Sequence, residues 1–586
     1  MKYPKIPLAQ TVVQLCKAHN IEHIVISPGS RSAPLTIGFT NDSFFKCYSV
    51  VDERSAAFFG LGIAQQIQHP VALVCTSGSA LLNYYPAIAE AFYSDIPLVV
   101  LSADRPKHLI GIGDGQTINQ KDVFVNHILY SANLKLDLRD ERKLAEVEET
   151  PILKNIEDRL ERFLGLQQDI QTHNEVETNT AIFKAIQKSG PVHINVPFDE
   201  PLYEMVDALD VKVKPLKLDT KSKKIDDFEI KQCLDDWNEA SKKMILVGVN
   251  PPNAVKPKWL DELANDDSVI VFTETTSNLH HDEFFPSIDK IIWPLDDEGL
   301  KKLQPDILLT FGGMIVSKKI KAFLRKYQPK QHWHVDEKKA FDTFFCLERH
   351  LKISPDAFFH TFLPKITHYV KSNYRPYWNT VKHYRLQKHQ DYLNQIPFTD
   401  LKAFDRILKS LPDNSILQLS NSSTVRYAQL FDLNKTLEVF CNRGTSGIDG
   451  SISTAIGCAV VNSKPITLVS GDLSFFYDSN ALWNALIPSS FRIILINNQG
   501  GGIFRILPGQ KNTDNFDCYF ETKHEFTAQQ LCNMYHFDYA SASNEMQLKN
   551  KLKSFYSESE RPRLLEIFTP RTSNDEVLLN YFDFLK

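Results

Sequence analysis

The sequence predicts an α/β protein of three Rossmann-like domains, each with a mostly parallel sheet flanked by helices. Two observations support this fold class. Apolar runs of strand length alternate with helical patterns along almost the whole chain, as is typical of parallel sheets with crossover helices. The chain also has 586 residues, 43% of them hydrophobic, which is enough for about three or four domains at roughly 100–200 residues each.

The strand candidates fall into three groups along the chain, with helices such as 55–66 between them. The first and middle groups are 21–26, 71–75, 97–101 and 192–196, then 244–248, 269–272, 306–311 and 332–335. Two stretches divide the groups. Residues 207–224 are rich in Lys and Asp, and residues 371–399, rich in Tyr, His, Lys and Arg, could equally form a connecting helix. We therefore predict domains at 1–205, 206–370 and 371–586.

Composition narrows the functional class. The net charge of −5 gives no sign of nucleic-acid binding or of an anionic membrane surface. Nine cysteines are scattered without a C-x-x-C pair, which argues against a disulfide framework or zinc site and for a reducing compartment. No apolar run approaches the roughly 18–20 residues of a membrane span, and the start has no signal-peptide pattern. A cytoplasmic protein with no integral membrane segment is expected.

The last third contains a βαβ unit with an oxygen ligand at the end of each strand. Asp472 follows the apolar run 465–470, Asn498 follows 491–496, and a helix is predicted at 478–486 between them. A carboxylate, an amide oxygen and a backbone carbonyl in the glycine run 500–502 could together hold one Mg²⁺, with open positions for phosphate oxygens. A lone Gly-Asp most often marks a turn, but here both ligands stand at strand ends before a glycine run. The pattern resembles the diphosphate-and-metal motif of thiamine-diphosphate enzymes.

Other loops allow two interpretations from the residues alone. Asp52 before an apolar helix fits an ordinary helix N-cap, although a thiamine enzyme needs one poorly solvated glutamate, here Glu53. The segment 27–32 is either an ordinary βα loop or an anion site with a central arginine. Residues 318–321 most simply form a solvated helix face. Motifs of serine hydrolases, P-loop NTPases and zinc proteases are absent from the sequence.

With these motifs, the chain resembles the 2-succinyl-5-enolpyruvyl-6-hydroxy-3-cyclohexene-1-carboxylate synthases of menaquinone biosynthesis, a thiamine-diphosphate family. The order of the matching stretches is that of the family, and Gly-Asp-Leu-Ser at 471–474 in place of Gly-Asp-Gly is typical of it. The middle third resembles the family only weakly. The matching stretches are 27–36, 52–54, 76–80, 103–106, 442–450, 471–474 and 497–504.

The resemblance implies the thiamine-diphosphate-binding fold, with pyrimidine-binding, central and diphosphate-binding domains. It also implies a homodimer or a dimer of dimers with active sites at subunit interfaces, where Glu53 of one chain meets the metal ligands of the other. Glu53 would be the catalytic residue, through a hydrogen bond to the cofactor's pyrimidine ring. The metal, Mg²⁺ or Mn²⁺, would take Asp472, Asn498 and Gly500. The cofactor would contact Glu53, Ile448, Gly471, Asp472, Leu473, Ser474, Asn498, Ile503 and Phe504.

The implied reaction removes CO₂ from 2-oxoglutarate and adds the succinyl semialdehyde unit to isochorismate. Both substrates carry two carboxylates, for which bidentate arginine is the best chemical match. The resemblance assigns the 2-oxoglutarate side to Ser422 and Arg426 and puts Arg443 between the two substrates. Where the family often has Lys-Arg, this chain has Lys318-Lys319, and lysine lacks the planar fork of arginine. The residues assigned to isochorismate are Ser30, Arg31, Arg105, Gln116 and Lys318.

Two alternatives remain open at this point. The chain could be another thiamine-diphosphate 2-oxo-acid decarboxylase or carboligase, although small neutral acceptors have no need of so many arginines. It could also be a nucleotide-binding or regulatory protein that keeps the fold without catalysis, although such a protein has no need of Glu53. Metal-dependent binding of thiamine diphosphate separates the second alternative from the first.

Overall fold

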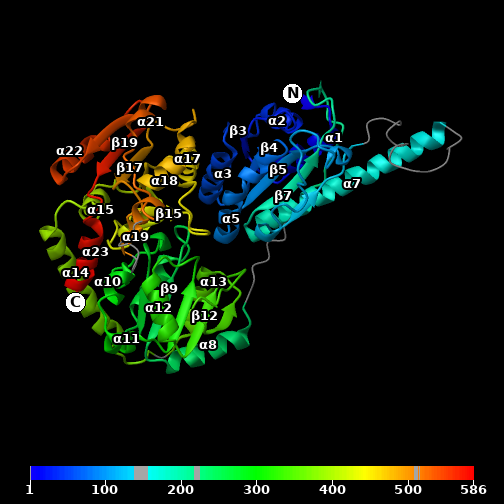
Figure 1. Cartoon of the computed structure of the whole chain (residues 1–586). Coiled ribbons are helices and arrows are strands. Elements are labelled where there is room, and N and C mark those ends of the chain that lie inside the picture. Colours follow the sequence, from blue (N-terminus) through cyan, green and yellow to red (C-terminus); the bar gives the residue numbers. More distant parts are fainter. Residues whose placement is uncertain (1, 138–155, 217–224, 368, 507–512, 514) are drawn as a thin grey trace. The chain divides into compact units, whose positions relative to one another are not determined.

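A computed structural model describes residues 2–137, 156–216, 225–367, 369–506, 513 and 515–586 (Figure 1). The chain forms two compact units. Unit 1 consists of Met1–Thr220, Ile452–Asn462 and Asn480–Ile487. Unit 2 consists of Lys221–Ser451, Ser463–Ser479 and Pro488–Lys586. Three larger sheets, all with parallel pairing, carry the described strands apart from the short antiparallel pair β1 (Tyr3–Pro4) and β8 (Met205–Val206). The predicted α/β class is therefore confirmed.

Unit 1 is built on a six-stranded parallel sheet in the order β3-β2-β4-β5-β7-β6. Its strands are β2 (His23–Ile26), β3 (Lys46–Ser49), β4 (Val71–Cys75), β5 (Leu98–Asp104), β6 (Ser131–Asn133) and β7 (Val192–Pro197). The long helix α7 extends past the end of the sheet (Figure 1). The helices of the first 220 residues are α1 (Pro7–Ala18), α2 (Ala33–Thr40), α3 (Glu53–Ile67), α4 (Ser79–Asn83), α5 (Tyr85–Ser94), α7 (Ile156–Lys188) and the 3₁₀ segments η1 (Lys107–Leu109) and η2 (Val125–His127).

Helix α17 (Ser451–Val461) lies mainly in unit 1 although it comes from the last third of the chain. It packs against α3 through two glycines. A Cβ on Gly62 would stand 2.1 Å from the Thr454 carbonyl oxygen, and a Cβ on Gly457 would stand 2.0 Å from the Phe59 carbonyl oxygen. Only hydrogen side chains allow backbones to approach this closely. The predicted boundary at 371 does not separate this helix from the first unit, and the three-domain division stays a prediction.

The first sheet of unit 2 has five parallel strands in the order β10-β9-β11-β12-β13. They are β9 (Lys243–Val247), β10 (Val269–Phe272), β11 (Ile307–Phe311), β12 (Gln331–Val335) and β13 (Leu347–Leu351). The accompanying helices are α8 (Asp227–Glu239), α9 (Pro257–Ala264), η3 (Thr275–Ser277), α10 (Ile288–Ile292), α11 (Asp297–Leu303), α12 (Lys318–Lys326), α13 (Pro355–Phe362) and η4 (Leu363–Lys365).

The second sheet of unit 2 has six parallel strands in the order β15-β14-β16-β17-β19-β18. They are β14 (Ile416–Leu419), β15 (Glu438–Cys441), β16 (Ile466–Gly471), β17 (Arg492–Asn497), β18 (Asp538–Ala542) and β19 (Arg563–Phe568). The helices are α14 (Tyr374–Gln395), α15 (Asp400–Leu408), α16 (Ser423–Ala428), α18 (Asp472–Tyr477), α19 (Ile503–Ile506), α20 (Phe516–Tyr519), α21 (Gln529–Met534), α22 (Glu545–Phe555) and α23 (Asn574–Phe584).

Helix α14 ties the two sheets of unit 2 together, so the alternative of a connecting helix at 371–399 is confirmed. Its first turns bury Tyr374 and Trp378 in the core beside the five-stranded sheet. Near its other end, His389 shares a 2.7 Å hydrogen bond with Tyr581 of α23. The other predicted linker is the segment 207–224, and its residues 217–224 lie outside the described part of the chain.

The helix predicted at 478–486 is wrong in position. Helix α18 begins at Asp472 itself, directly after β16, and the 3₁₀ segment η5 (Ser479–Leu482) follows it. The helix dipole favours a carboxylate in the first turn of a helix, and this effect suits a helix that begins at Asp472. The predicted helix start did not take this effect into account. Beyond η5, the Asn484 side chain accepts a hydrogen bond from the Leu486 amide at 2.9 Å. Asparagine favours such local turns over a helix.

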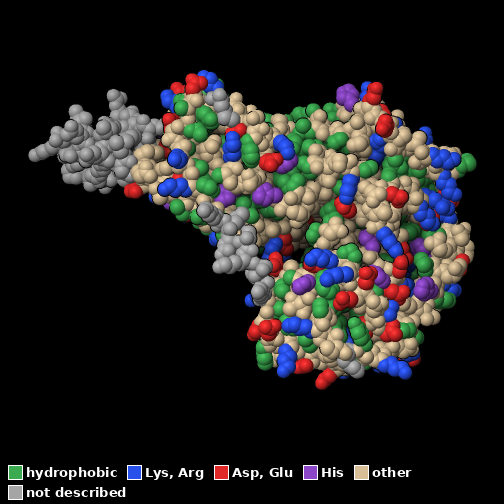
Figure 2. Space-filling model, turned by 180° about the vertical axis from the view of Figure 1, so that it is seen from behind, with side chains coloured by type: hydrophobic (Ala, Val, Ile, Leu, Met, Phe, Trp, Pro, Cys, Tyr) green, Lys and Arg blue, Asp and Glu red, His purple; other side chains and the backbone are tan. Residues whose placement is uncertain are grey.

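Charged side chains of both signs are interspersed over much of the face shown in Figure 2. This agrees with the nearly balanced total of 66 basic and 71 acidic residues. Among the described helices, none is both long and apolar enough to span a membrane.

Candidate active site

The predicted metal ligands lie at one edge of the six-stranded sheet of unit 2. Strands β16 and β17 are parallel neighbours, with Gly471 opposite Ile496, so Asp472 and Asn498 both stand at their carboxyl ends. Asp472 is 3% exposed. Its Oδ1 accepts the Leu473 amide at 2.7 Å and its Oδ2 accepts the Gly500 amide at 3.0 Å. The structure therefore brings Asp472 and the glycine run together.

The amide of Asn498 is oriented by a carboxylate that the sequence analysis missed. Asn498 Nδ2 donates to Asp400 Oδ2 at 3.0 Å, and Thr569 donates to Asp400 Oδ1 at 2.6 Å. Since the nitrogen faces Asp400, the amide oxygen is the atom available as a ligand. Burial raises the pKa of Asp400 to about 6, against the lowering effect of these hydrogen bonds. In the sequence, Asp400 is an ordinary acidic residue in a first helical turn, which gives no sign of this role.

The glycine run has no room for side chains. Gly500 has φ +149°, and a Cβ there would stand 2.7 Å from the Glu521 carbonyl oxygen. A Cβ on Gly502 would stand 3.3 Å from Asn498 Nδ2. The Gly500 carbonyl accepts the Gly502 amide at 3.0 Å, which leaves its second lone pair for a metal. The donor set of one carboxylate, one amide oxygen and one carbonyl thus fits a hard divalent cation.

Two further contacts surround these ligands. His524 Nε2 lies 3.2 Å from Asp472 Oδ2, a neighbour that no sequence motif indicated. Ser474 donates through Oγ to the Ile448 carbonyl at 2.6 Å, which fixes the loop 442–450 against α18. Ile448, Leu473, Ile503 and Phe504 are half-buried. In the described part of the chain, no three His, Cys, Asp or Glu side chains gather as a metal site, which agrees with a predicted set containing one carboxylate.

The predicted arginines of unit 2 act on each other electrostatically, and the carboxylates of Asp289 and Glu274 also act on Arg426. Arg443 is 8% exposed, and its side chain donates to Asn421 Oδ1 at 2.6 Å. The Nε atoms of Arg426 and Arg443 are buried without a hydrogen-bond partner. Burial lowers the pKa of Arg426, and the neighbouring Arg443 lowers it further. Buried guanidinium groups that repel each other, with donors left over, suit a carboxylate ligand.

Asn421 organises the loop that carries Arg443. Its Nδ2 donates to the Asn442 carbonyl at 2.6 Å and to the Gly447 carbonyl at 2.7 Å. Ser422, the next residue, is the N-cap of α16 with φ 67°. Lys318, the first residue of α12, is exposed. Ser422 and Arg426 are thus presented by one short helix, as the resemblance implied for one substrate.

In unit 1, Glu53 opens helix α3 directly after its N-cap. The bland interpretation of Asp52 is confirmed, since its Oδ1 accepts the Ser55 amide at 3.2 Å. Glu53 itself is half-buried. Burial raises the pKa of Tyr84 well above its usual range, and the Glu53 carboxylate adds to this. The Glu53 carboxylate thus acts electrostatically on a buried hydroxyl group of unit 1, and its catalytic role stays a prediction.

Unit 1 also brings together two of its predicted substrate-binding cations. Arg31 is 8% exposed, donates to the Phe198 carbonyl at 3.1 Å and lies 3.3 Å from Glu200 Oε1. Burial lowers the pKa of Arg31, and the nearby Arg105 lowers it further. Arg105 donates to the Gly115 carbonyl at 2.9 Å. Gly115 directly precedes the exposed Gln116, so this bond brings Arg105 close to that part of the loop. Ser30 is also exposed. Glu53 and these residues belong to unit 1 and the metal ligands to unit 2, so their meeting stays a prediction.

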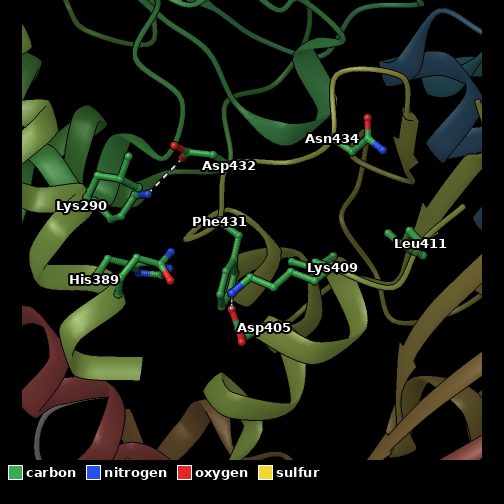
Figure 3. A pocket seen from close by; sticks show the side chains of 11 residues that line it. Lys290, His389, Asp405, Lys409, Leu411, Phe431, Asp432 and Asn434 are labelled. Carbon is green, nitrogen blue, oxygen red and sulfur yellow. Dashed lines mark hydrogen bonds and ion pairs between the residues drawn. The ribbon is translucent and has the colours of Figure 1, made fainter. Parts of the chain in front are cut away.

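A separate cavity of about 220 Å³ in unit 2 contains none of the predicted site residues (Figure 3). Its charges are paired across it. Lys290 lies 3.0 Å from Asp432, and Lys409 pairs with Asp405 one helical turn away. In each pair the two charges neutralise each other, so these four side chains leave little net charge in the cavity. The lining residues are Lys290, Leu386, His389, Gln390, Asp405, Leu408, Lys409, Leu411, Phe431, Asp432 and Asn434.

Comparison with known proteins gives two family matches and close full-length relatives. Residues 6–123 match the N-terminal TPP-binding domain of thiamine pyrophosphate enzymes, and residues 421–567 match the C-terminal TPP-binding domain. The chain is 56% identical to the 2-succinyl-5-enolpyruvyl-6-hydroxy-3-cyclohexene-1-carboxylate synthase of Christiangramia forsetii, over 100% of both chains. It is 54% identical to the enzyme of that name from Flavobacterium psychrophilum over 99% of both, and 34% to that from Bacteroides thetaiotaomicron over 98% of both.

Proposed function

This chain belongs to the 2-succinyl-5-enolpyruvyl-6-hydroxy-3-cyclohexene-1-carboxylate synthase family, and on that basis we propose that it catalyses the reaction for which the family is named. It is a thiamine-diphosphate enzyme, a carboligase of menaquinone biosynthesis. In the proposed reaction, 2-oxoglutarate loses CO₂ and its succinyl semialdehyde unit joins isochorismate. The observation that carries the proposal is the 56% identity over the full length of both chains.

The residues at the sheet edge fit thiamine diphosphate with one divalent cation. Asp472, Asn498 and the Gly500 carbonyl would hold Mg²⁺ or Mn²⁺, because all three are hard oxygen donors at adjoining strand ends. When bound, thiamine diphosphate supplies a nucleophilic carbon that allows a 2-oxo acid to be decarboxylated and passed to an acceptor. Glu53 would hydrogen-bond the pyrimidine ring and hold a proton there. Ile448, whose carbonyl accepts a hydrogen bond from Ser474, would contact the cofactor through its branched side chain.

The arginines supply the charge that two dicarboxylates require. Ser422 and Arg426 would bind 2-oxoglutarate, and Arg443 would lie between the two substrates. The Nε atoms of Arg426 and Arg443 are buried without a hydrogen-bond partner, which supports the proposal. The residues proposed for isochorismate are Ser30, Arg31, Arg105, Gln116 and Lys318.

We also propose a homodimer or dimer of dimers, with each active site completed by Glu53 of one chain and the metal ligands of another. All nine cysteines are free thiols, several of them buried, which suits a reducing compartment such as the cytoplasm. Light scattering at varied protein concentration, with activity measured in parallel, tests the assembly. A fully active monomer contradicts it.

The activity is tested with purified protein, thiamine diphosphate and Mg²⁺. We expect CO₂ release from 2-oxoglutarate together with loss of isochorismate, and loss of both after chelation of the metal by EDTA. Pyruvate should replace 2-oxoglutarate poorly. Isochorismate left untouched by the complete mixture overturns the proposed function, and equal use of pyruvate identifies another 2-oxo-acid carboligase.

A further inference from the structure

Gln116, one of the residues proposed for isochorismate, has an unusual backbone conformation. Its φ is +54°, in the left-handed region that residues other than glycine seldom adopt. The segment 111–116 is exposed, so burial of its own side chains does not hold the backbone in this conformation. Contacts with other segments of unit 1 therefore have to offset the cost of a left-handed residue.

The backbone of Gln116 lies against Gly78, the residue before α4. Gly78 itself has φ +86°. A Cβ on Gly78 would stand 3.2 Å from the Gln116 carbonyl oxygen and 3.4 Å from the Gln116 Cα. A glycine allows this close approach, and the approach places the backbone of Gln116 directly against the loop between β4 and α4.

The side chain of Gln120 joins the same two segments. Gln120 follows Gln116 by four residues and is fully buried. Its Oε1 accepts the Gly78 amide at 3.0 Å. Gln116 meets Gly78 through its backbone and Gln120 meets it through its side chain, so the segment 116–120 is fastened to Gly78 at both ends.

The nitrogen of the Gln120 amide is anchored in the six-stranded sheet of unit 1. Nε2 donates to Asn195 Oδ1 at 2.8 Å. The Ser102 hydroxyl and the Ala103 carbonyl are further acceptors, each at 3.3 Å. These groups belong to the neighbouring strands β5 and β7. Both ends of the amide are thus in use, and an apolar side chain of similar size could make none of these bonds.

The backbone of Arg105 is anchored by different groups. Asn195 Nδ2 donates to Asp104 Oδ2 at 2.8 Å, and Asp104 Oδ1 accepts the Arg105 amide at 2.8 Å. Ser102 donates to Asn195 Oδ1 at 3.1 Å, so this oxygen keeps a partner when the Gln120 amide is removed. Loss of the Gln120 amide should therefore leave the backbone of Arg105 in place.

We infer that Gln120 is a positioning residue for isochorismate binding, and that it acts by holding Gln116 in its left-handed conformation against Gly78. Because Gln120 is fully buried, it acts through Gln116 and not by contact with the substrate. The inference rests on the proposed function, since it takes Gln116 as an isochorismate residue. It predicts a defect confined to one substrate, because 2-oxoglutarate is assigned to Ser422 and Arg426 of unit 2.

The test compares steady-state kinetics of Gln120→Leu and Asn174→Leu as holoenzymes, with each substrate varied while the other is saturating. Gln120→Leu should raise the KM for isochorismate about 10-fold, the factor for about one lost hydrogen bond. The KM for 2-oxoglutarate and kcat should stay within about threefold. Asn174 is the matched control, a fully buried amide of unit 1 that bonds the Lys135 backbone at 2.7 and 2.8 Å. Asn174→Leu should lower the melting temperature but keep both KM values within about twofold.

A double-mutant cycle shows whether Gln120 acts through Gln116. Gln116→Ala alone should raise the isochorismate KM, and the addition of Gln120→Leu should change that KM less than about threefold. Gly78→Ala disturbs the same contact while Gln120 is intact, since its Cβ would press on the Gln116 carbonyl. It should also raise the isochorismate KM selectively, and it keeps the inference testable if Gln120→Leu does not fold.

The outcomes separate this inference from the proposed function. Wild-type protein that leaves isochorismate untouched overturns both. With active wild-type protein, an unchanged isochorismate KM in Gln120→Leu, or in Gly78→Ala where Gln120→Leu does not fold, overturns the inference alone. So do KM increases that multiply in the double variant, because Gln120 then acts without Gln116. An equal rise in the KM of both substrates also overturns it, since that result assigns Gln120 only to the stability of unit 1.

Discussion

Replacement of Asn421 by alanine tests whether the arginine loop is held by one side chain. Asn421 is 2% exposed and joins β14 to the loop 442–450 through three bonds. It donates to the Asn442 and Gly447 carbonyls at 2.6 and 2.7 Å, and it accepts from Arg443 at 2.6 Å. Alanine removes these three bonds, together with a weaker one from Cys441 Sγ to Asn421 Oδ1 at 3.3 Å, and leaves two buried carbonyls and one buried guanidinium with one partner fewer.

The magnitude follows from the kind of each bond. A bond to a charged group contributes about 1.5–3 kcal/mol and each neutral one about 1 kcal/mol. The three share one residue, so their loss is less than additive, and we expect the free energy of unfolding of unit 2 to fall by about 3 kcal/mol. At roughly 2 °C per kcal/mol for a large domain, the melting temperature falls by about 5 °C. Because Arg443 loses its anchor, the KM for 2-oxoglutarate should rise about 10-fold.

The assay is thermal unfolding of the full chain without cofactor, followed by steady-state kinetics of the holoenzyme. Asn550→Ala, on the exposed face of α22, is the control and should melt within about 1 °C of the wild type. Asn421→Asp keeps an acceptor for Arg443 but loses the two bonds that Nδ2 donates. It should therefore lower the melting temperature while the KM for 2-oxoglutarate stays near the wild-type value. If Asn421→Ala melts with the control and binds 2-oxoglutarate normally, the loop is held by other contacts and the reasoning fails.

Two further predictions concern unit 1. Glu53→Gln should lower kcat at least about 100-fold, the contribution of a positioned acid–base group, while calorimetry shows Mg²⁺-dependent thiamine diphosphate binding largely retained; an active variant excludes the catalytic role of Glu53. Gly62→Ala should destabilise the α3–α17 contact by about 1–3 kcal/mol or more, since its Cβ would stand 2.1 Å from the Thr454 carbonyl oxygen. Gly115→Ala is the control, because no atom lies within 4 Å of a Cβ at this position, and it should melt like the wild type. If Gly62→Ala melts at the same temperature as Gly115→Ala, the α3–α17 contact does not depend on the missing side chain and the prediction fails.

Most central strands could be predicted from the sequence, although β14 and β19 are absent from the predicted set, and most strands at sheet edges could not be predicted. The runs that became β4, β9 and β17 are continuous apolar segments because helices cover both sides of a central parallel strand. The unpredicted strands β3 and β13 end their sheets and carry polar residues, in the sequences KCYS and LERHL. An edge strand is half solvated, so its composition does not distinguish it from a loop.

The predicted metal ligands could be placed from the sequence because they directly follow strands. The side chains that contact these ligands, Asp400 and His524, could not be predicted. A residue directly after a parallel strand has a fixed place in the fold, so the sequence predicts that Asp472 and Asn498 stand at the same edge of the sheet. Asp400 and His524 reach the same edge from 72 positions before Asp472 and 52 after it, from a helix and a loop. Contacts of this kind depend on how separate segments pack, and no local pattern records them.

The lysines of α12 show the same limit at the level of single side chains. Their spacing predicts a helix, and the helix is present, but spacing does not say which lysine faces a ring. That choice depends on Trp293, which comes from another segment of the five-stranded half of unit 2. The resemblance assigns Lys318 to isochorismate and puts Lys319 where the family often has arginine, and in the structure the Lys319 Nζ lies 3.5 Å from the centre of the Trp293 ring. The position of a long flexible cation depends on contacts from other segments, and the spacing of lysines along a helix does not record those contacts.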